Sequence, residues 1–185
     1  QDFCYWDYPL IELDGKTIGI IGFGGIGKNV ATIATAFGMK VMVSTRTTPQ
    51  PAPEGIDFCE LDTLFEKSDI ISLHCPLTKA TEGLINADRL RQMKNNAFLI
   101  NIARGKLVVE QDLTDALNND QISGAGLDVL ITEPADPNCP LLKAKNCFIT
   151  PHFAWATHAS RSRLLKTAIS NVESYIQGNP QNVVN

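Results

Sequence analysis

The chain has 185 residues, of which 44% are hydrophobic and 19% charged, a composition typical of a folded globular domain and unlike that of disordered proteins. Its formal net charge of −4 at pH 7 predicts no general attraction to nucleic acid or to an anionic membrane. No apolar run reaches the roughly 20 residues of a membrane-spanning helix, and the first ten residues lack the basic start and apolar stretch of a signal peptide.

The cysteines predict neither a disulfide framework nor a metal site. Their number is odd and no two of them have the CxxC spacing of a zinc ligand pair. The simplest interpretation is five reduced thiols in a cytoplasmic protein, at Cys4, Cys59, Cys75, Cys139 and Cys147.

Apolar runs alternate with amphipathic stretches along the chain. In chain order, the pattern predicts a strand at 16–21, a helix at 26–37, a strand at 40–43, a helix at 61–67, a strand at 69–73, a helix at 86–93, a strand at 97–102, a helix at 110–118, strands at 123–129 and 146–149, and a helix from about 157 to 176. Strands this apolar, alternating with helices, are typical of a doubly wound α/β fold with a parallel sheet, which here ends in a C-terminal helix. Three prolines between 132 and 142 predict an irregular loop.

A glycine-rich turn follows the first predicted strand. It reads Gly22-Phe-Gly24-Gly-Ile-Gly27 and opens a helix, which is the GxGxxG pattern in its expected context. Gly22 permits a tight turn, Gly24 leaves room for a pyrophosphate, and Gly27 lets the helix pack close to the strand. Gly25 and Ile26 lie at the helix N-terminus, where free N–H groups favour phosphate. The sequence therefore predicts a Rossmann-type dinucleotide-binding domain.

The end of the second strand bears on the choice of dinucleotide. An NAD-selective site usually has Asp or Glu about 20 residues beyond the glycines, but no acidic residue occurs between Gly15 and Pro53. Arg46, beside the hydroxyl of Thr45, offers a charged planar donor group for a 2′-phosphate. We therefore expect an NAD(P) site that prefers NADP(H); the alternative is that Arg46 stacks on the adenine and either cofactor binds.

Five blocks of sequence carry a resemblance to a known family. They are ELDGKTIGIIGFGGIG (12–27), SLHCPLT (72–78), NIARGKLVVEQDL (101–113), GAGLDVLITEP (124–134) and TPHFAWAT (150–157). In this order they resemble the D-isomer-specific 2-hydroxyacid dehydrogenases, which use NAD(P) to interconvert 2-keto and 2-hydroxy acids. The runs GLDVL, EP, PLL, TPHFAWAT and SRSRL look most like the members that reduce hydroxypyruvate to D-glycerate.

The resemblance also implies a division into parts. Family members carry about 100 residues before the point that matches Gln1, which form much of a substrate domain. Residues 16–156 would then be the NAD(P)-binding domain and residues 1–15 a linker arm. The helix and tail at 157–185 would belong to the otherwise absent substrate domain.

Three residues are implied as catalytic. Arg104 would contact the carboxylate and keto oxygen of the substrate, because its planar fork of donors fits a planar carboxylate. His152 would be the general acid and base. Glu133 would hydrogen-bond the imidazole, orient the ring and favour its charged form. Since Glu133 and His152 are 19 positions apart, only the fold can bring them together.

Weaker cofactor contacts are implied around the strand ends. Cys75 and Pro76 would flank the cofactor, as would Ile102. Asp128 would place the nicotinamide ring, since a buried carboxylate without a partner is costly. His74, which directly precedes Cys75, is interpreted as a packing residue.

The expected partner is a small 2-keto or 2-hydroxy acid, and the family resemblance implies a homodimer. Two alternatives stay open. In the first, the substrate is another D-2-hydroxyacid or its keto acid, such as lactate, phosphoglycerate or glyoxylate. In the second, the protein is a cofactor-sensing binding module; this alternative arises because the C-terminal-binding-protein corepressors carry similar blocks and the same catalytic residues.

Overall fold

The computed structural model of the chain describes residues 4–5 and 10–184. It divides into two compact units, one ending at Thr150 and the other beginning at Pro151. Much of the expected linker arm (1–3 and 6–9) lies outside the described residues. The assignment of 1–15, 16–156 and 157–185 to separate parts of a whole protein stays a prediction.

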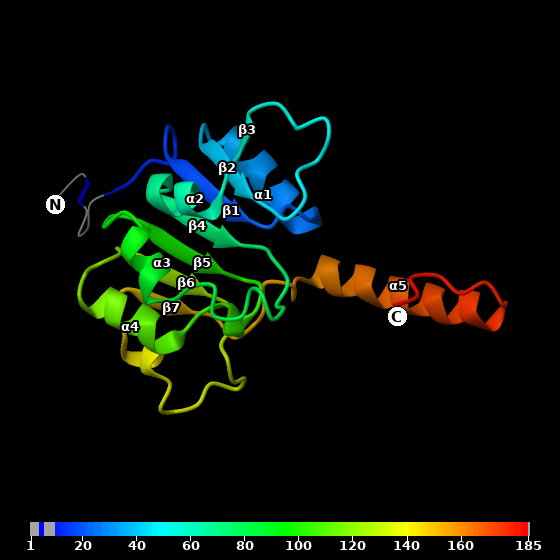
Figure 1. The fold of residues 1–185 in the computed structure, drawn as a ribbon. Helices are drawn as coiled ribbons and strands as arrows, with labels where there is room; N and C mark the ends of the chain where they lie inside the picture. Colours follow the sequence, from blue (N-terminus) through cyan, green and yellow to red (C-terminus); the bar gives the residue numbers. More distant parts are fainter. Residues whose placement is uncertain (1–3, 6–9, 185) are drawn as a thin grey trace. The chain divides into compact units, whose positions relative to one another are not determined.

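The first unit is built on a parallel sheet (Figure 1). Among the described residues the sheet has seven strands in the order β3-β2-β1-β4-β5-β6-β7, and every neighbouring pair is parallel. The order reverses between β1 and β4, which is where such folds open a binding crevice at the carboxyl ends of the strands. The strands are β1 (Thr17–Ile21), β2 (Lys40–Ser44), β3 (Ile56–Phe58), β4 (Ile70–Leu73), β5 (Phe98–Asn101), β6 (Gly124–Leu127) and β7 (Cys147–Ile149).

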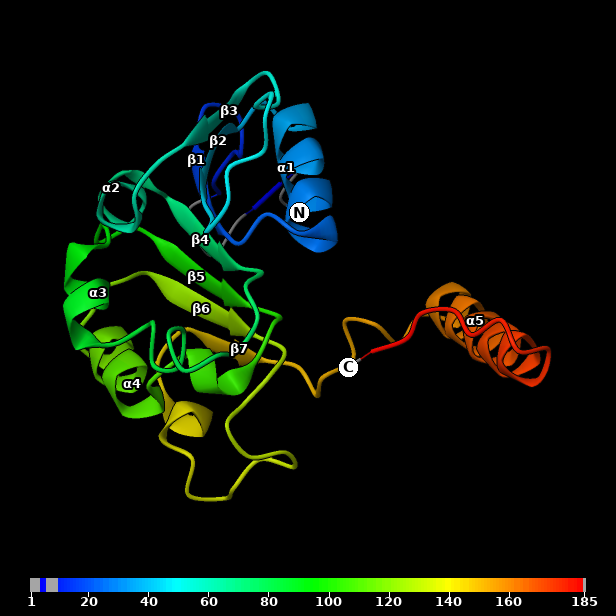
Figure 2. The same cartoon turned by 45° about the vertical axis from the view of Figure 1, so that its right-hand side comes forward.

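Helices cover both faces of this sheet (Figure 2), so the predicted doubly wound α/β fold is confirmed. One face carries α1, whose Ala31 and Ala34 pack into a small core with Ile20 and Val43. The other face carries the larger core, to which α2, α3 and α4 contribute. The helices and 3-10 turns are α1 (Gly25–Ala36), α2 (Leu61–Lys67), α3 (Ala87–Gln92), η1 (Gly105–Leu107), α4 (Glu110–Asn118) and η2 (Pro140–Lys143).

The predicted elements agree with the structure apart from their ends and three short pieces, one of which is the unpredicted 3-10 turn η1. Strand β3 was missed, because it has three residues and one of them is an exposed aspartate. The prediction of an irregular loop at 132–142 was wrong at its end, where Pro140–Lys143 forms a 3-10 helix. Pro140 occupies the first helical position, where its missing N–H removes no hydrogen bond. Asn86 caps α3, accepting the Arg89 N–H at 3.1 Å.

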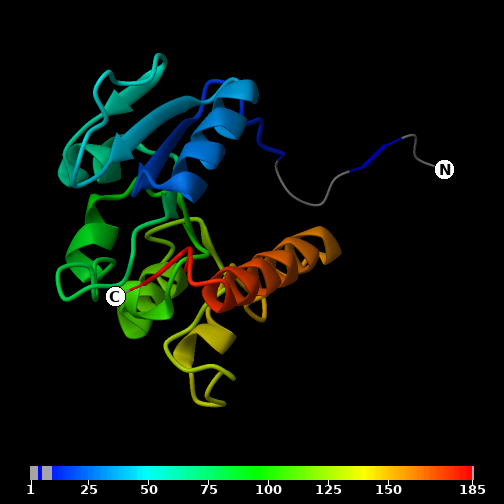
Figure 3. The ribbon, with the colours of Figure 1, turned by 90° about the vertical axis from the view of Figure 1, so that its right-hand side faces the viewer.

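The second unit is one helix with a returning tail (Figure 3). Helix α5 (His158–Ile176) is capped by Thr157, whose Oγ1 accepts the Ser160 N–H at 3.2 Å. The chain then turns at Gly178, where φ is +77°, and Gln181 Nε2 donates to Ser170 Oγ at 2.6 Å. Among the described helices, α5 included, none is both long and apolar enough to cross a membrane.

Candidate cofactor and active site

In the turn between β1 and α1, two glycines are required by close packing and a third faces open space. Gly22 has φ of +97°, and a Cβ there would lie 2.7 Å from the backbone nitrogen of Cys75. A Cβ at Gly27 would lie 2.2 Å from the carbonyl oxygen of Gly22. Around Gly24, by contrast, a Cβ would meet no protein atom within 4 Å. The turn is therefore tightly packed on the protein side and open at Gly24, where an added group has room.

The N-terminus of α1 adds donors to this opening. The first N–H groups of a helix have no acceptor within it, and the N-cap residue of α1, Gly24, has no side chain to accept from them. The first turn of α1 also carries no acidic residue, and both Gly25 and Ile26 are exposed. The open space, the available N–H groups and the positive end of the helix dipole together fit a pyrophosphate.

A cavity lies at the carboxyl ends of β1, β2 and β4. It brings together Gly22 and Gly24 with Thr45 and Arg46 at the end of β2. Cys75 and the residues that follow it close the cavity after β4, and Leu61 and Leu84 add an apolar wall. The cavity therefore collects predicted dinucleotide contacts from the glycine turn and from the end of β2, although Arg46 itself is exposed, and Leu61 and Leu84 were not predicted.

A second cavity adjoins the first, because residues 74–76 line both. Its other lining residues are Leu77, which continues this segment after β4, Ile26 of α1, and Ile102, Ala103 and Arg104 of the loop after β5. Predicted cofactor contacts from three places in the sequence therefore line this cavity together with the predicted substrate arginine.

The loop that carries Arg104 is held by Asn101, which is fully buried. The Asn101 side chain accepts the Ala103 N–H at 3.0 Å and donates to the Arg104 carbonyl at 2.9 Å. Sequence reasoning missed this residue. The one available signal was a polar side chain ending an apolar strand, which requires hydrogen-bond partners if it is buried.

The segment at the junction of the two cavities is uncharged at neutral pH. Burial lowers the pKa of His74, and its Nε2 lies 2.8 Å from Ser72 Oγ. Burial also raises the pKa of the Cys75 thiol. Both observations support the interpretation of His74 as a packing residue and of Cys75 as an apolar contact.

The two predicted acidic residues follow β6. Asp128 is 5% exposed and accepts the Thr150 hydroxyl at 2.6 Å. Glu133 lies in the next loop, where its Oε1 accepts the Leu130 N–H at 3.0 Å. His152 belongs to the second unit, in which its φ is +51° and its carbonyl accepts the Trp155 ring N–H. The proposed partnership of His152 with Glu133 thus stays a prediction.

The comparison with protein families decides the chain's relationship. Residues 5–154 match the NAD binding domain of the D-isomer specific 2-hydroxyacid dehydrogenases. The chain belongs to this family. The resemblance drawn from the five blocks is confirmed. Among the described residues of this dehydrogenase domain, no group of three or more His, Cys, Asp and Glu side chains is arranged to hold a metal ion.

Curated relatives of the dehydrogenase domain include two with 2-hydroxyacid activities in their names. This chain is 51% identical over 185 residues to a hydroxypyruvate reductase of Blautia hydrogenotrophica, and 44% identical over 186 residues to a glycerate dehydrogenase of Methylorubrum extorquens. Each match takes in 100% of this chain, which spans 58% and 57% of the length of those relatives.

Two solved structures share the fold closely. One is a D-isomer specific 2-hydroxyacid dehydrogenase from Lactobacillus delbrueckii ssp. bulgaricus in its NAD complexed form. It is 34% identical to this chain with a TM-score of 0.89, and the match covers 100% of this chain and 61% of the dehydrogenase chain. An acyclic imino acid reductase in complex with NADPH and D-Arg is 38% identical with a TM-score of 0.89, covering 100% and 59%.

Proposed function

We propose that this dehydrogenase domain binds a nicotinamide dinucleotide across the two adjoining cavities, and that the whole protein reduces hydroxypyruvate to D-glycerate. One observation carries the proposal: the open glycine turn at Gly24 and the arginine predicted to bind substrate, Arg104, border cavities that share residues 74–76. A dinucleotide seated on the turn would extend along this shared segment. The names of the hydroxypyruvate reductase and glycerate dehydrogenase relatives support the choice of substrate.

Each of the chain's own groups has a defined task in this proposal. The bound cofactor supplies the hydride. Arg104 holds the substrate carboxylate, because its guanidinium makes two parallel charge-assisted hydrogen bonds with a planar anion. His152 donates a proton to the oxygen that becomes the hydroxyl, and Glu133 orients the imidazole and favours its charged form. Asp128, Cys75, Pro76 and Ile102 position the cofactor.

We further propose that the site prefers NADP(H). Arg46 lines the first cavity beside Thr45 and Thr47, and no carboxylate lines that cavity among the described residues. A carboxylate there would accept the ribose 2′-hydroxyl and repel a 2′-phosphate, whereas a guanidinium binds that phosphate. Solved relatives have been crystallised with NAD and with NADPH.

A kinetic screen of the whole protein tests the proposed activity. Hydroxypyruvate, glyoxylate, pyruvate and a 2-imino acid are each supplied with NADPH or NADH, and cofactor oxidation is followed. We expect the highest kcat/KM with hydroxypyruvate and NADPH. The imino acid is included because of the imino acid reductase neighbour. Turnover no higher than background with every substrate would contradict the proposal and favour a cofactor-sensing binding module.

The expected homodimer and cytoplasmic location also stay predictions.

A further inference from the structure

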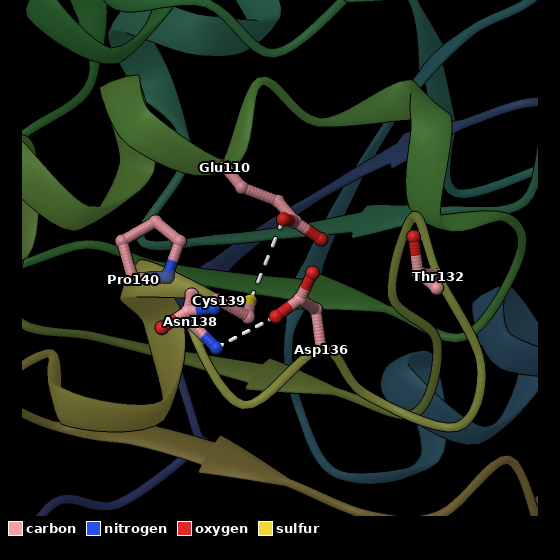
Figure 4. Close-up of a pocket in the computed structure, with 6 residues that line it drawn as sticks. All are labelled: Glu110, Thr132, Asp136, Asn138, Cys139 and Pro140. Atoms are coloured by element: carbon pink, nitrogen blue, oxygen red, sulfur yellow. Dashed lines mark hydrogen bonds between the residues drawn. The ribbon is translucent and has the colours of Figure 1, made fainter.

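One carboxylate holds both ends of the loop that carries Glu133. Glu110, at the start of α4, accepts the Ile131 N–H through Oε1 at 2.9 Å. Its Oε2 accepts a hydrogen bond from the Cys139 thiol at 3.4 Å (Figure 4). The residues between these ends are exposed, whereas Cys139 and Leu130, which flank the exposed stretch, are buried. The loop is therefore fixed at its ends and has little packing along its middle.

The same bonds set the position of Glu133. The N–H of Leu130 goes to Glu133 Oε1 at 3.0 Å, and the next N–H along the chain, that of Ile131, goes to Glu110 Oε1. Two consecutive backbone N–H groups thus donate to two different carboxylates, one to each. If Glu110 were lost, the Ile131 N–H would lack this acceptor and the turn that aims Glu133 would lose one of its bonds.

The thiol end of the loop is suited to donate. Burial raises the pKa of Cys139, and the hydrogen bond and negative charge of Glu110 raise it further. The sulfur therefore keeps its proton at neutral pH and donates to the carboxylate. A thiol is a weak hydrogen-bond donor, so we expect the bond from the Ile131 N–H to Glu110 to hold the loop more strongly than the bond from the Cys139 thiol.

A third contact joins this loop to the one that carries Arg104. Gly105 follows Arg104 directly, and a Cβ at Gly105 would lie 2.0 Å from the Leu130 carbonyl carbon and 2.5 Å from the Ile131 nitrogen. The peptide that Glu110 holds is therefore the peptide on which the Arg104 loop packs. A shift of this peptide would move the segments that carry the predicted substrate arginine and the predicted acid–base partner.

We propose that Glu110 is a positioning residue for the reaction: by closing loop 131–139 and fixing the peptide between Leu130 and Ile131, it holds Glu133 in register with Arg104. This inference rests on the proposed function, in which Glu133 orients the acid–base histidine. Glu110 itself contacts neither substrate nor cofactor in this proposal.

Asp112 provides a matched control on the same helix. It also lies in the first turn of α4, so its removal costs the same favourable interaction with the helix dipole. Its Oδ2 accepts a backbone N–H, that of Ala87, at 2.8 Å. That bond supports the start of α3 rather than a loop with a predicted catalytic residue. Asp112→Ala and Glu110→Ala should therefore lower the melting temperature to a similar extent.

The test is a double-mutant cycle on kcat in the whole protein. We expect Glu110→Ala to lower kcat for hydroxypyruvate by about 10- to 100-fold, as small displacements of catalytic groups do. The Kd for NADPH should be unchanged, and Asp112→Ala should keep kcat within about two-fold of wild type. Glu110→Gln keeps an oxygen that can accept the Ile131 N–H, so it should recover most of the loss. In a Glu133→Gln background, Glu110→Ala should have little further effect, because the two residues act as one unit.

The outcomes separate this inference from the proposed function. If Glu133→Gln slows turnover but Glu110→Ala behaves like Asp112→Ala, the inference is overturned and the proposed function stands. If Glu133→Gln leaves turnover intact, the role proposed for Glu133 fails and this inference fails with it, while the proposed reaction stands. Should Glu110→Ala not fold, Glu110→Met, which keeps the length of the side chain but has no carboxylate to accept the Ile131 N–H, takes its place in the cycle: additive effects with Glu133→Gln overturn the inference, and non-additive effects support it.

Discussion

Gly22 lies so close to Cys75 that no side chain fits between them. A Cβ at Gly22 would stand 2.7 Å from the backbone nitrogen of Cys75, and the backbone of Gly22 has a φ of +97° that other residues rarely adopt. The glycine turn and the segment after β4 are therefore built against each other. Any widening of the turn must also displace the segment that lines both cavities.

Alanine substitutions in the turn should separate folding from cofactor binding. Gly22→Ala introduces backbone strain and a clash, and we expect it to lower the free energy of unfolding by about 3 kcal/mol. Gly24→Ala meets no protein atom within 4 Å, so its melting temperature should equal that of wild type. Its Kd for NADPH should nevertheless rise about ten-fold or more, because the methyl group occupies space proposed for the pyrophosphate. Calorimetric binding and thermal unfolding check both; wild-type affinity in Gly24→Ala would contradict this placement.

Arg46 should control the choice between the two cofactors. A hydrogen bond to a charged group contributes about 2 kcal/mol, so Arg46→Ala should raise the Kd for NADPH roughly 30-fold. The Kd for NADH, which has no 2′-phosphate, should change little. Arg91→Ala is the control, because this arginine pairs with Asp88 on α3. Equal affinity of the wild type for both cofactors, or an unchanged NADPH affinity in Arg46→Ala, would show that the guanidinium does not bind the phosphate.

His152 should be needed for proton transfer and not for cofactor binding. We expect His152→Gln to lower kcat by about 100-fold or more, since a positioned general acid contributes that much. The Kd for NADPH should stay at the wild-type value. His158→Gln, at the first residue of α5, is the matched control and should keep wild-type kinetics. Retained turnover in His152→Gln would remove this residue as the acid.

Local features of the chain could be predicted from the sequence, and features that depend on distant contacts could not. The glycine turn carries its own signal, because Gly22, Gly24 and Gly27 follow a β-branched strand directly. Strands β1 and β4 to β6 were visible as apolar runs, since helices cover both faces of the sheet.

The support of the site left no such signal. Glu110 lies 21 positions before Ile131 and 29 before Cys139, and no periodicity relates these residues. A glutamate in the first turn of a helix is explained by the helix dipole alone. Asn101 was similarly hidden, because its two hydrogen bonds depend on how the chain turns after β5.

Another carboxylate, that of Asp69, ties together three segments of the first unit. Its Oδ2 accepts the Thr17 N–H at the start of β1, and its Oδ1 accepts the Lys94 ammonium beyond α3, each at 2.8 Å. Burial acts to raise the pKa of Asp69. The hydrogen bonds from Lys94 and Thr17 and the charges of Lys94 and Lys16 outweigh that effect, so the pKa is lowered overall.

The lowered pKa of Asp69 predicts an acid-sensitive contribution to stability. The folded state binds a proton at this carboxyl less readily than the unfolded state, so its contribution is fully present above the unfolded pKa of about 3.9 and is lost as pH falls through the lower folded value. We expect Asp69→Asn to lower the free energy of unfolding by about 2 kcal/mol at pH 7, with the difference shrinking below about pH 4. Urea unfolding of both proteins across this range measures it, with Asp88→Asn, which removes an exposed ion pair, as the control. A difference between wild type and Asp69→Asn that stays constant down to about pH 3 would show that the charge of this carboxylate does not stabilise the fold.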